Sequence, residues 1–189
     1  MKKTLYRVAV VTLAVLSSPV SAADLTEAPN YRAYSETFSS SGQPDAAQLA
    51  HAAELGFERV IYLSFAGDST ALDGEDGIVV ENGMRYVQLP VDWNAPEVDD
   101  FRTFAAIMQA QPDTKTLVHC QVNFRASTFS FLYRVAVLGE SITDAKPALD
   151  SVWNPNETWF RFIRDTLESY GIPAQCDACD WGENEFVDP

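Results

Sequence analysis

Apolar residues follow two different spacings along the chain. Compact runs rich in β-branched and aromatic residues, which are typical of buried strands, occupy residues 59–64, 85–89 and 116–119. Apolar residues three and four positions apart predict amphipathic helices between and after these runs. The helices are expected at residues 46–55, 97–109, 126–138, 143–152 and 157–170. Because strands alternate with helices, the pattern predicts an α/β fold with a central, mostly parallel sheet flanked by helices.

Local signals refine this outline at its N-terminal end. Asp45 is expected to cap the first helix. Residues 78–80 are β-branched and predict a further short strand, which a turn at 82–83 joins to the next strand. The polar stretch 23–41 is expected to be irregular and held to the core by its aromatic residues. These aromatic residues are Tyr31, Tyr34 and Phe38.

The first 22 residues have the pattern of a secretory signal peptide. Basic residues precede an apolar run at 8–16, and small residues follow at 20–22. The run is shorter than the roughly 20 residues of a membrane span, so we expect no span after cleavage. A retained anchor is the alternative. The pattern predicts one mature domain over residues 23–189 in the periplasm or outside the cell.

Charge restricts the classes of partner. The whole chain has a formal net charge of −14, and removal of residues 1–22 would leave 10 basic residues against 27 acidic ones, a net charge of −17. Such a surface repels nucleic acid at long range, so no nucleic-acid partner is expected. A small anionic substrate stays possible because a binding site can be locally positive.

The three cysteines have different surroundings. In an oxidising compartment Cys176 and Cys179 are expected to form a local disulfide, which leaves Cys120 as a reactive thiol. The pair could instead be a redox or metal motif. One member could also be the partner with which an oxidised Cys120 forms a disulfide. Cys120 could alternatively be a buried structural cysteine.

The strongest chemical signal lies where the apolar run 116–119 gives way to a helix. A short loop at such a junction directs backbone N–H groups inward, and the helix N-terminus adds partial positive charge, so the loop can hold an anion. Cys120 is expected to be a thiolate there, able to attack phosphorus or a sulfane sulfur. Arg125 can bind two oxygens of the anion. The remaining loop candidates are His119, Gln121, Val122, Asn123, Phe124, Ala126 and Ser127.

These residues resemble the protein tyrosine and dual-specificity phosphatase superfamily. The resemblance rests on the His-Cys pair, the arginine that follows and Ser127, and it covers roughly residues 41–139. The segment 86–92 (YVQLPVD) looks like the strand and acid loop of that family. Ser-Gly-Gln-Pro at 41–44, before a helix and the strand RVIYL, resembles a bacterial subgroup found fused to β-lactamase-like hydrolases.

The resemblance implies a mechanism without a metal or cofactor. Cys120 attacks a small phosphoester or a phosphoprotein and forms a thiophosphate, while Asp92, 28 residues earlier, serves as general acid. Asp99 or Asp100 could take that role, or no acid at all. Arg125 holds the equatorial oxygens, Ser127 helps the thiolate leave, and His119 orients the loop by hydrogen bonds.

The loop is one residue shorter than that of the phosphatase family. Four residues separate Cys120 from Arg125, where the family has five, and Asn123 replaces the usual glycine. A six-residue loop resembles that of rhodanese-type sulfurtransferases. Two alternatives therefore remain open: a sulfurtransferase, and a non-catalytic protein that binds oxyanions.

Overall fold

The computed structural model describes residues 23–176 and 178–182, and it confirms the α/β fold. Five strands form one sheet in the order β1-β2-β5-β3-β4. All neighbours pair in parallel except β1, which is antiparallel to β2. The strands are β1 (Arg32–Ala33), β2 (Phe38–Ser41), β3 (Arg59–Tyr62), β4 (Arg85–Gln88) and β5 (Thr116–His119). The expected signal peptide at 1–22 lies outside the described residues.

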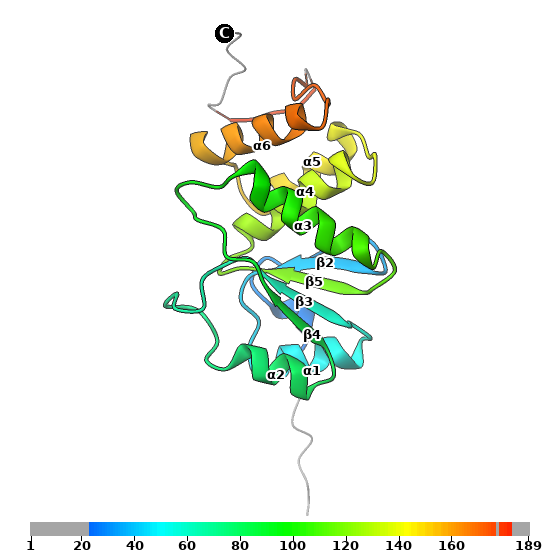
Figure 1. Cartoon of the computed structure of the whole chain (residues 1–189), viewed down its shortest axis with the longest axis vertical. Coiled ribbons are helices and arrows are strands. Elements are labelled where there is room, and N and C mark those ends of the chain that lie inside the picture. The colour runs from blue at the N-terminus through cyan, green and yellow to red at the C-terminus, as the bar shows by residue number, and fades with distance from the viewer. Residues whose placement is uncertain (1–22, 177, 183–189) are drawn as a thin grey trace, which may run out of the picture.

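Helices cover both faces of the sheet (Figure 1). Helices α1 (Ala46–Glu54) and α2 (Glu75–Glu81) lie on one face. The opposite face is covered by a thicker layer, in which α6 lies farthest from the sheet. Its helices are α3 (Val98–Ala110), α4 (Phe124–Ala136), α5 (Ile142–Asp150) and α6 (Glu157–Ser169). Because both faces are covered, every residue of β2, β3 and β5 is buried, which explains the continuous apolar runs of β3 and β5.

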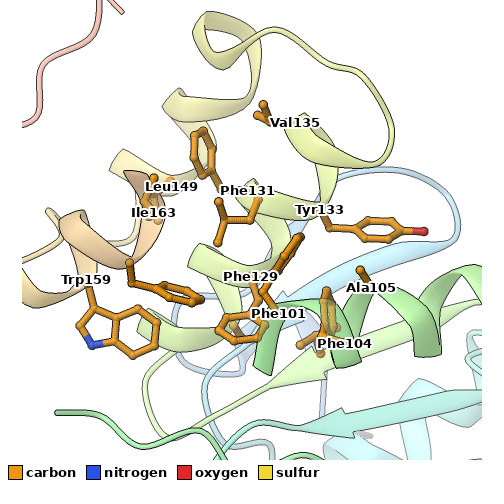
Figure 2. Packing of buried hydrophobic residues seen from close by; sticks show 14 of the residues in the cluster. Phe101, Phe104, Ala105, Phe129, Phe131, Tyr133, Val135, Leu149, Trp159 and Ile163 are labelled. Carbon is orange, nitrogen blue, oxygen red and sulfur yellow. The ribbon is translucent and has the colours of Figure 1, made fainter. Parts of the chain in front are cut away.

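The main core is aromatic and lies between the sheet and the thicker helical layer. Figure 2 shows Phe101 and Phe104 of α3 beside Phe129 of α4, with Trp159 of α6 close by. All four side chains are 0% exposed. Phe129 meets Phe104 edge to face at a centroid distance of 5.5 Å. Burial of a side chain of this size stabilises the fold by about 2–3 kcal/mol, so these residues fix α3, α4 and α6 on the sheet.

One predicted strand is wrong. Residues 78–80 belong to the helix α2, and the turn at 82–83 ends that helix, with Gly83 at a φ of 81°. The reason is topological: β3 and β4 are parallel, so the chain between them has to cross over one face of the sheet. Val79 then buries against the sheet as a helical residue.

A strand is also found where an irregular segment was expected. Within 23–41 the structure has a short 3₁₀ helix (Leu25–Glu27), β1 and β2. Strand β2 reads FSSS, which has neither apolar alternation nor high β-propensity. Its buried hydroxyls are satisfied by neighbours: Tyr31 donates to Ser39, and Tyr34 is 2.7 Å from Ser40. The expected anchoring by aromatic residues is therefore present, but it holds a strand.

The C-terminal segment closes over the thicker helical layer. Cys176 and Cys179 form the expected disulfide, and Cys120 is free. Beyond the disulfide, Trp181 is buried against Phe131 and Phe160. Within residues 23–176 and 178–182, the helices are too short or too polar to cross a membrane.

Candidate active site

The cysteine-to-arginine loop follows the central strand β5. The register pairs Ser41 of β2 and Tyr62 of β3 with His119, so all three strands end at the same edge of the sheet. In open α/β sheets, ligands bind outside the carboxyl ends of the strands, where neighbouring connections leave in opposite directions. The loop leads directly into α4 and lies at such a position.

The loop backbone is fastened from outside by the segment before α1. The amide of Gln43 donates to the carbonyl of Gln121 at 3.0 Å, and the Asn30 side chain donates to the carbonyl of Val122 at 3.0 Å. In a trans peptide the N–H points opposite to the C=O. Because both carbonyls are turned outward, the amides of Val122 and Asn123 are turned toward the inside of the loop. This is the orientation that an anion site requires.

Asn123 completes the turn into α4. Its φ is 71°, a left-handed conformation that asparagine tolerates better than most residues, as expected for a residue in place of glycine. Its side-chain amide donates to the carbonyl of Asn30 at 2.6 Å and does not cap α4. The first-turn amides of α4 are thus left without a side-chain cap, and the helix dipole there favours an anion.

Arg125 is buried but only partly hydrogen-bonded. It is 6% exposed, and its Nη1 donates to the hydroxyl of Ser64. The guanidinium carbon lies 5.6 Å from the ring centroid of Trp93. Nε is buried and has no partner among the described residues. A buried guanidinium nitrogen without an acceptor is costly, and an oxyanion would supply the missing acceptor.

Cys120 shares a cavity with Arg125. The cavity measures about 370 Å³ and is mainly apolar. We call it the cysteine cavity; it is lined by Trp93, Cys120, Gln121, Val122, Phe124 and Arg125. The thiol is 1% exposed and packs against the main core on one side, so Cys120 is both buried and part of a site. The expected meeting of Cys120 with Arg125 is present.

Asp92 lies in the loop that forms one wall of the cysteine cavity, since its neighbour Trp93 lines it. The carboxylate is exposed and accepts the amide of Asn94 at 2.8 Å. The alternative acids are engaged in the first turn of α3. Asp100 accepts the amide of Glu97, and Asp99 pairs with Arg102. Of the three carboxylates, Asp92 is the one whose neighbour lines the cysteine cavity, and its role as general acid remains a prediction.

His119 has a different environment from the one expected. Side chains alternate along β5, so His119 and Cys120 face opposite sides of the sheet. The His119 ring stacks on Tyr62 at 4.7 Å, and its Nε2 lies 2.9 Å from the Glu75 carboxylate. Nδ1 has no partner among the described residues. The hydrogen bonds that orient the loop come from Asn30 and Gln43, not from this imidazole.

The first turn of α4 holds the last two candidates. Ala126 is fully buried under the loop. The Ser127 hydroxyl is buried and donates to the carbonyl of Phe124 at 3.1 Å. Assistance to the leaving thiolate by Ser127 stays a prediction.

Four residues that sequence reasoning did not assign to the site contribute to it: Asn30, Gly42, Ser64 and Trp93. A Cβ on Gly42 would lie 2.9 Å from the carbonyl oxygen of Gln121 and 3.0 Å from Cα of Val122, so only glycine fits there. The Gly-Gln-Pro sequence and the position next to Asp92 were available signals for Gly42 and Trp93. Asn30 and Ser64 had none, because their contacts lie 93 and 61 residues away.

A second cavity of about 430 Å³ opens at the ends of β3 and β4. We call it the acidic cavity; its polar lining comprises Tyr62, Asp73, Glu75, Asp76, Tyr86 and Gln88. Burial raises the pKa of Tyr62 to about 12, and the nearby Glu75 charge adds to the rise. The pKa of Tyr86 is raised by the same two causes. The charge of this cavity is therefore unfavourable for an anion.

No protein-family model and no curated protein matches the chain. Among solved structures, it is similar to the "Putative phosphatase (DUF442)" of Shewanella putrefaciens CN-32, with a TM-score of 0.69 and 29% identity over 77% of this chain and 96% of that chain. It shares its fold with P. aeruginosa TpbA in complex with pTyr (TM-score 0.62, 17% identity, 81% and 96% coverage). It also shares its fold with PTPMT1 in complex with PI(5)P (TM-score 0.64, 14% identity, 75% and 96% coverage).

The fold is the one found in these tyrosine- and dual-specificity-phosphatase-like structures, as the sequence resemblance indicated. The similarity to the DUF442 protein extends to the sequence as well as the fold. The relation to the subgroup fused to β-lactamase-like hydrolases stays a prediction.

Proposed function

We propose that this protein is a cysteine-dependent phosphatase that hydrolyses a phosphoester through a thiophosphate intermediate on Cys120. The substrate is a small phosphoester or a phosphoprotein, and the expected signal peptide suggests the periplasm or the cell exterior as its location. The similar solved structures are phosphatases of one superfamily, which supports this reaction class.

The observation that carries the proposal is the state of Arg125. Its guanidinium is buried, fixed on one edge by Ser64 and on one face by Trp93, and unpartnered at Nε. It lines the same cavity as Cys120. A nucleophile and a preorganised cation at one small cavity are the elements needed for attack on an oxyanion.

The residues suggest a two-step reaction. In the first step the Cys120 thiolate forms a bond to phosphorus while the bond to the leaving oxygen breaks, and Asp92 gives that oxygen a proton. In the second step the Asp92 carboxylate takes a proton from a water molecule, whose oxygen attacks phosphorus. The sulfur–phosphorus bond breaks, and thiolate and inorganic phosphate are released. Arg125 and the inward amides stabilise the equatorial oxygens in both steps.

Because the loop from Cys120 to Arg125 has the six-residue length that resembles rhodanese-type sulfurtransferases, a sulfurtransferase reaction is the alternative to test. In that reaction the Cys120 thiolate would take the outer sulfur of thiosulfate, giving a persulfide and sulfite. A non-catalytic protein would bind oxyanions without either product. The shared phosphatase fold favours the phosphatase reaction over both.

The test is turnover of p-nitrophenyl phosphate by the reduced, purified protein. We expect phosphate release that orthovanadate inhibits, and a loss of roughly 10⁴-fold or more in kcat for Cys120→Ser. The matched control is Ser130→Ala, a buried hydroxyl in α4 that bonds to the Ala126 carbonyl and to Tyr34 and does not line the cysteine cavity. Persulfide formation from thiosulfate without phosphate release would overturn the proposal in favour of a sulfurtransferase. Phosphate binding without turnover of aryl, alkyl or peptide phosphoesters would indicate a non-catalytic protein.

A further inference from the structure

Ser64 is a buried polar residue without a place in the mechanism above. It lies two residues beyond the end of β3 and is 0% exposed. Its hydroxyl accepts a hydrogen bond from Nη1 of Arg125, and both groups are buried. On the basis of the proposed phosphatase reaction, we infer that Ser64 is a positioning residue that aims the guanidinium of Arg125 at the bound oxyanion.

The backbone around Ser64 is fixed from two strands. The Gln88 side chain at the end of β4 donates to the carbonyl of Ser64 at 3.3 Å. The preceding residue, Leu63, donates its amide to the carbonyl of His119 at 2.9 Å, and its carbonyl accepts the amide of Val91 at 3.1 Å. The hydroxyl therefore has a defined position relative to both the nucleophile strand β5 and the loop that bears Asp92.

This hydroxyl decides which edge of the guanidinium is free. Nη1 is occupied by Ser64, and Trp93 covers one face. Nε is buried without a partner, so the edge formed by Nε and Nη2 is the one left for a ligand. That edge presents two parallel N–H donors, the geometry that binds two oxygens of a phosphoryl group.

A neutral acceptor also preserves the charge of Arg125. Among residues 23–176 and 178–182, the carboxylates that pair with arginines pair with Arg102, Arg134, Arg161 and Arg164, not with Arg125. A carboxylate in place of Ser64 would hold the guanidinium equally well but would cancel its attraction for an anion. In a chain with 27 acidic residues, a hydroxyl orients the cation and leaves its charge for the substrate.

The test measures anion affinity and turnover in Ser64→Ala. We expect the affinity for inorganic phosphate, measured by calorimetry, and kcat/KM for p-nitrophenyl phosphate each to fall about 10–100-fold, the range for loss of a hydrogen bond to a charged group. The melting temperature should change little more than in the matched control Ser130→Ala. Ser64→Thr and Ser64→Val give side chains of equal size, of which only threonine has a hydroxyl. The Thr variant should therefore retain the phosphate affinity and turnover that the Val variant loses.

A double-mutant cycle then asks whether Ser64 acts through Arg125. In an Arg125→Lys background, where Nη1 is absent, Ser64→Ala should have almost no further effect on phosphate affinity. Equal losses in both backgrounds, or equal activity of the Thr and Val variants, would overturn the inference while the phosphatase reaction stands. If the wild type binds phosphate but does not hydrolyse the substrate, the proposed function is wrong. The role of Ser64 is then tested by phosphate affinity alone. If the wild type neither binds phosphate nor hydrolyses p-nitrophenyl phosphate, both proposals are wrong.

Discussion

The two cavities at the carboxyl edge of the sheet differ in the charge of their walls. The cysteine cavity has apolar walls and one buried cation, Arg125, whereas the acidic cavity is lined by the carboxyl groups of Asp73, Glu75 and Asp76. The volumes are similar, about 370 and 430 Å³. An anion is therefore directed to the first by local charge, although the chain as a whole is strongly acidic. The net charge of the chain sets the electrostatic field at long range. Within the cysteine cavity, the single buried guanidinium determines which ligand charge is favoured.

The residues between the cavities explain how such different environments coexist. Tyr62 and His119 stack beside the acidic cavity, and the Ser64 hydroxyl contacts both Tyr62 and Arg125. We expect substitutions in the cysteine cavity to change turnover and substitutions in the acidic cavity to change stability.

Asp92→Asn should have the largest effect in this comparison. The amide cannot supply a proton, so kcat for phenyl phosphate should fall about 10³-fold. The loss should be smaller with p-nitrophenyl phosphate, because its leaving oxygen is stable without a proton. Steady-state kinetics with both substrates provide the measurement. A larger loss in Asp99→Asn or Asp100→Asn would assign the proton donor to α3.

Gly42→Ala should lower kcat/KM about 100-fold, because the new Cβ would push the Gln121 carbonyl and displace the amides of the loop. The matched control is Gly67→Ala, where a Cβ meets no atom within 4 Å. The measurement is hydrolysis of p-nitrophenyl phosphate at several substrate concentrations. Unchanged kinetics in the Gly42 variant would mean that the segment before α1 does not fix the loop.

Glu75→Gln should act mainly on stability. The carboxylate is 4% exposed, lies 2.9 Å from His119 Nε2 and accepts the Gln43 side chain at 3.0 Å. Loss of its charge should lower the free energy of unfolding by about 2–3 kcal/mol, measured by urea denaturation. Glu81→Gln, at an exposed position of the same helix, should stay within about 0.5 kcal/mol of the wild type. If Glu75→Gln lost as much turnover as Asp92→Asn, the expectation that the acidic cavity affects stability and not turnover would be wrong.

Tyr62→Phe should have the smallest effect, and its distinguishing sign is a changed pH dependence of stability at high pH. Burial holds the pKa of Tyr62 at about 12 in the folded protein, above its ordinary value of 10.0. The folded state therefore favours the protonated phenol. Its contribution to stability is complete below pH 10 and is lost as the pH rises toward 12. Urea denaturation at pH 9 and 11 should show a shallower decline in the variant than in the wild type or in Tyr170→Phe, an exposed control.

Much of the framework could be predicted from local sequence. Strands β3, β4 and β5 and the helices that follow β4 and β5 were predicted within a few residues, because their apolar spacing matches their burial. The Asp45 cap and the Cys176–Cys179 disulfide were also predicted. Residues 78–80 were mistaken for a strand, because β-branched residues favour strands locally and the parallel pairing that requires a helix is a long-range fact.

The sequence by itself determined that a cysteine and an arginine meet at a strand-to-helix loop, since four residues between them leave little freedom. Only the tertiary structure decided what surrounds that pair. Asn30 turns a loop carbonyl outward, Ser64 occupies one edge of the guanidinium, and the Trp159 indole donates to the Trp93 carbonyl at 3.0 Å. These contacts join residues that are 61 to 92 positions apart in the sequence. Local propensities do not predict such pairs, because the pairs form only when the sheet and its helical layers have assembled.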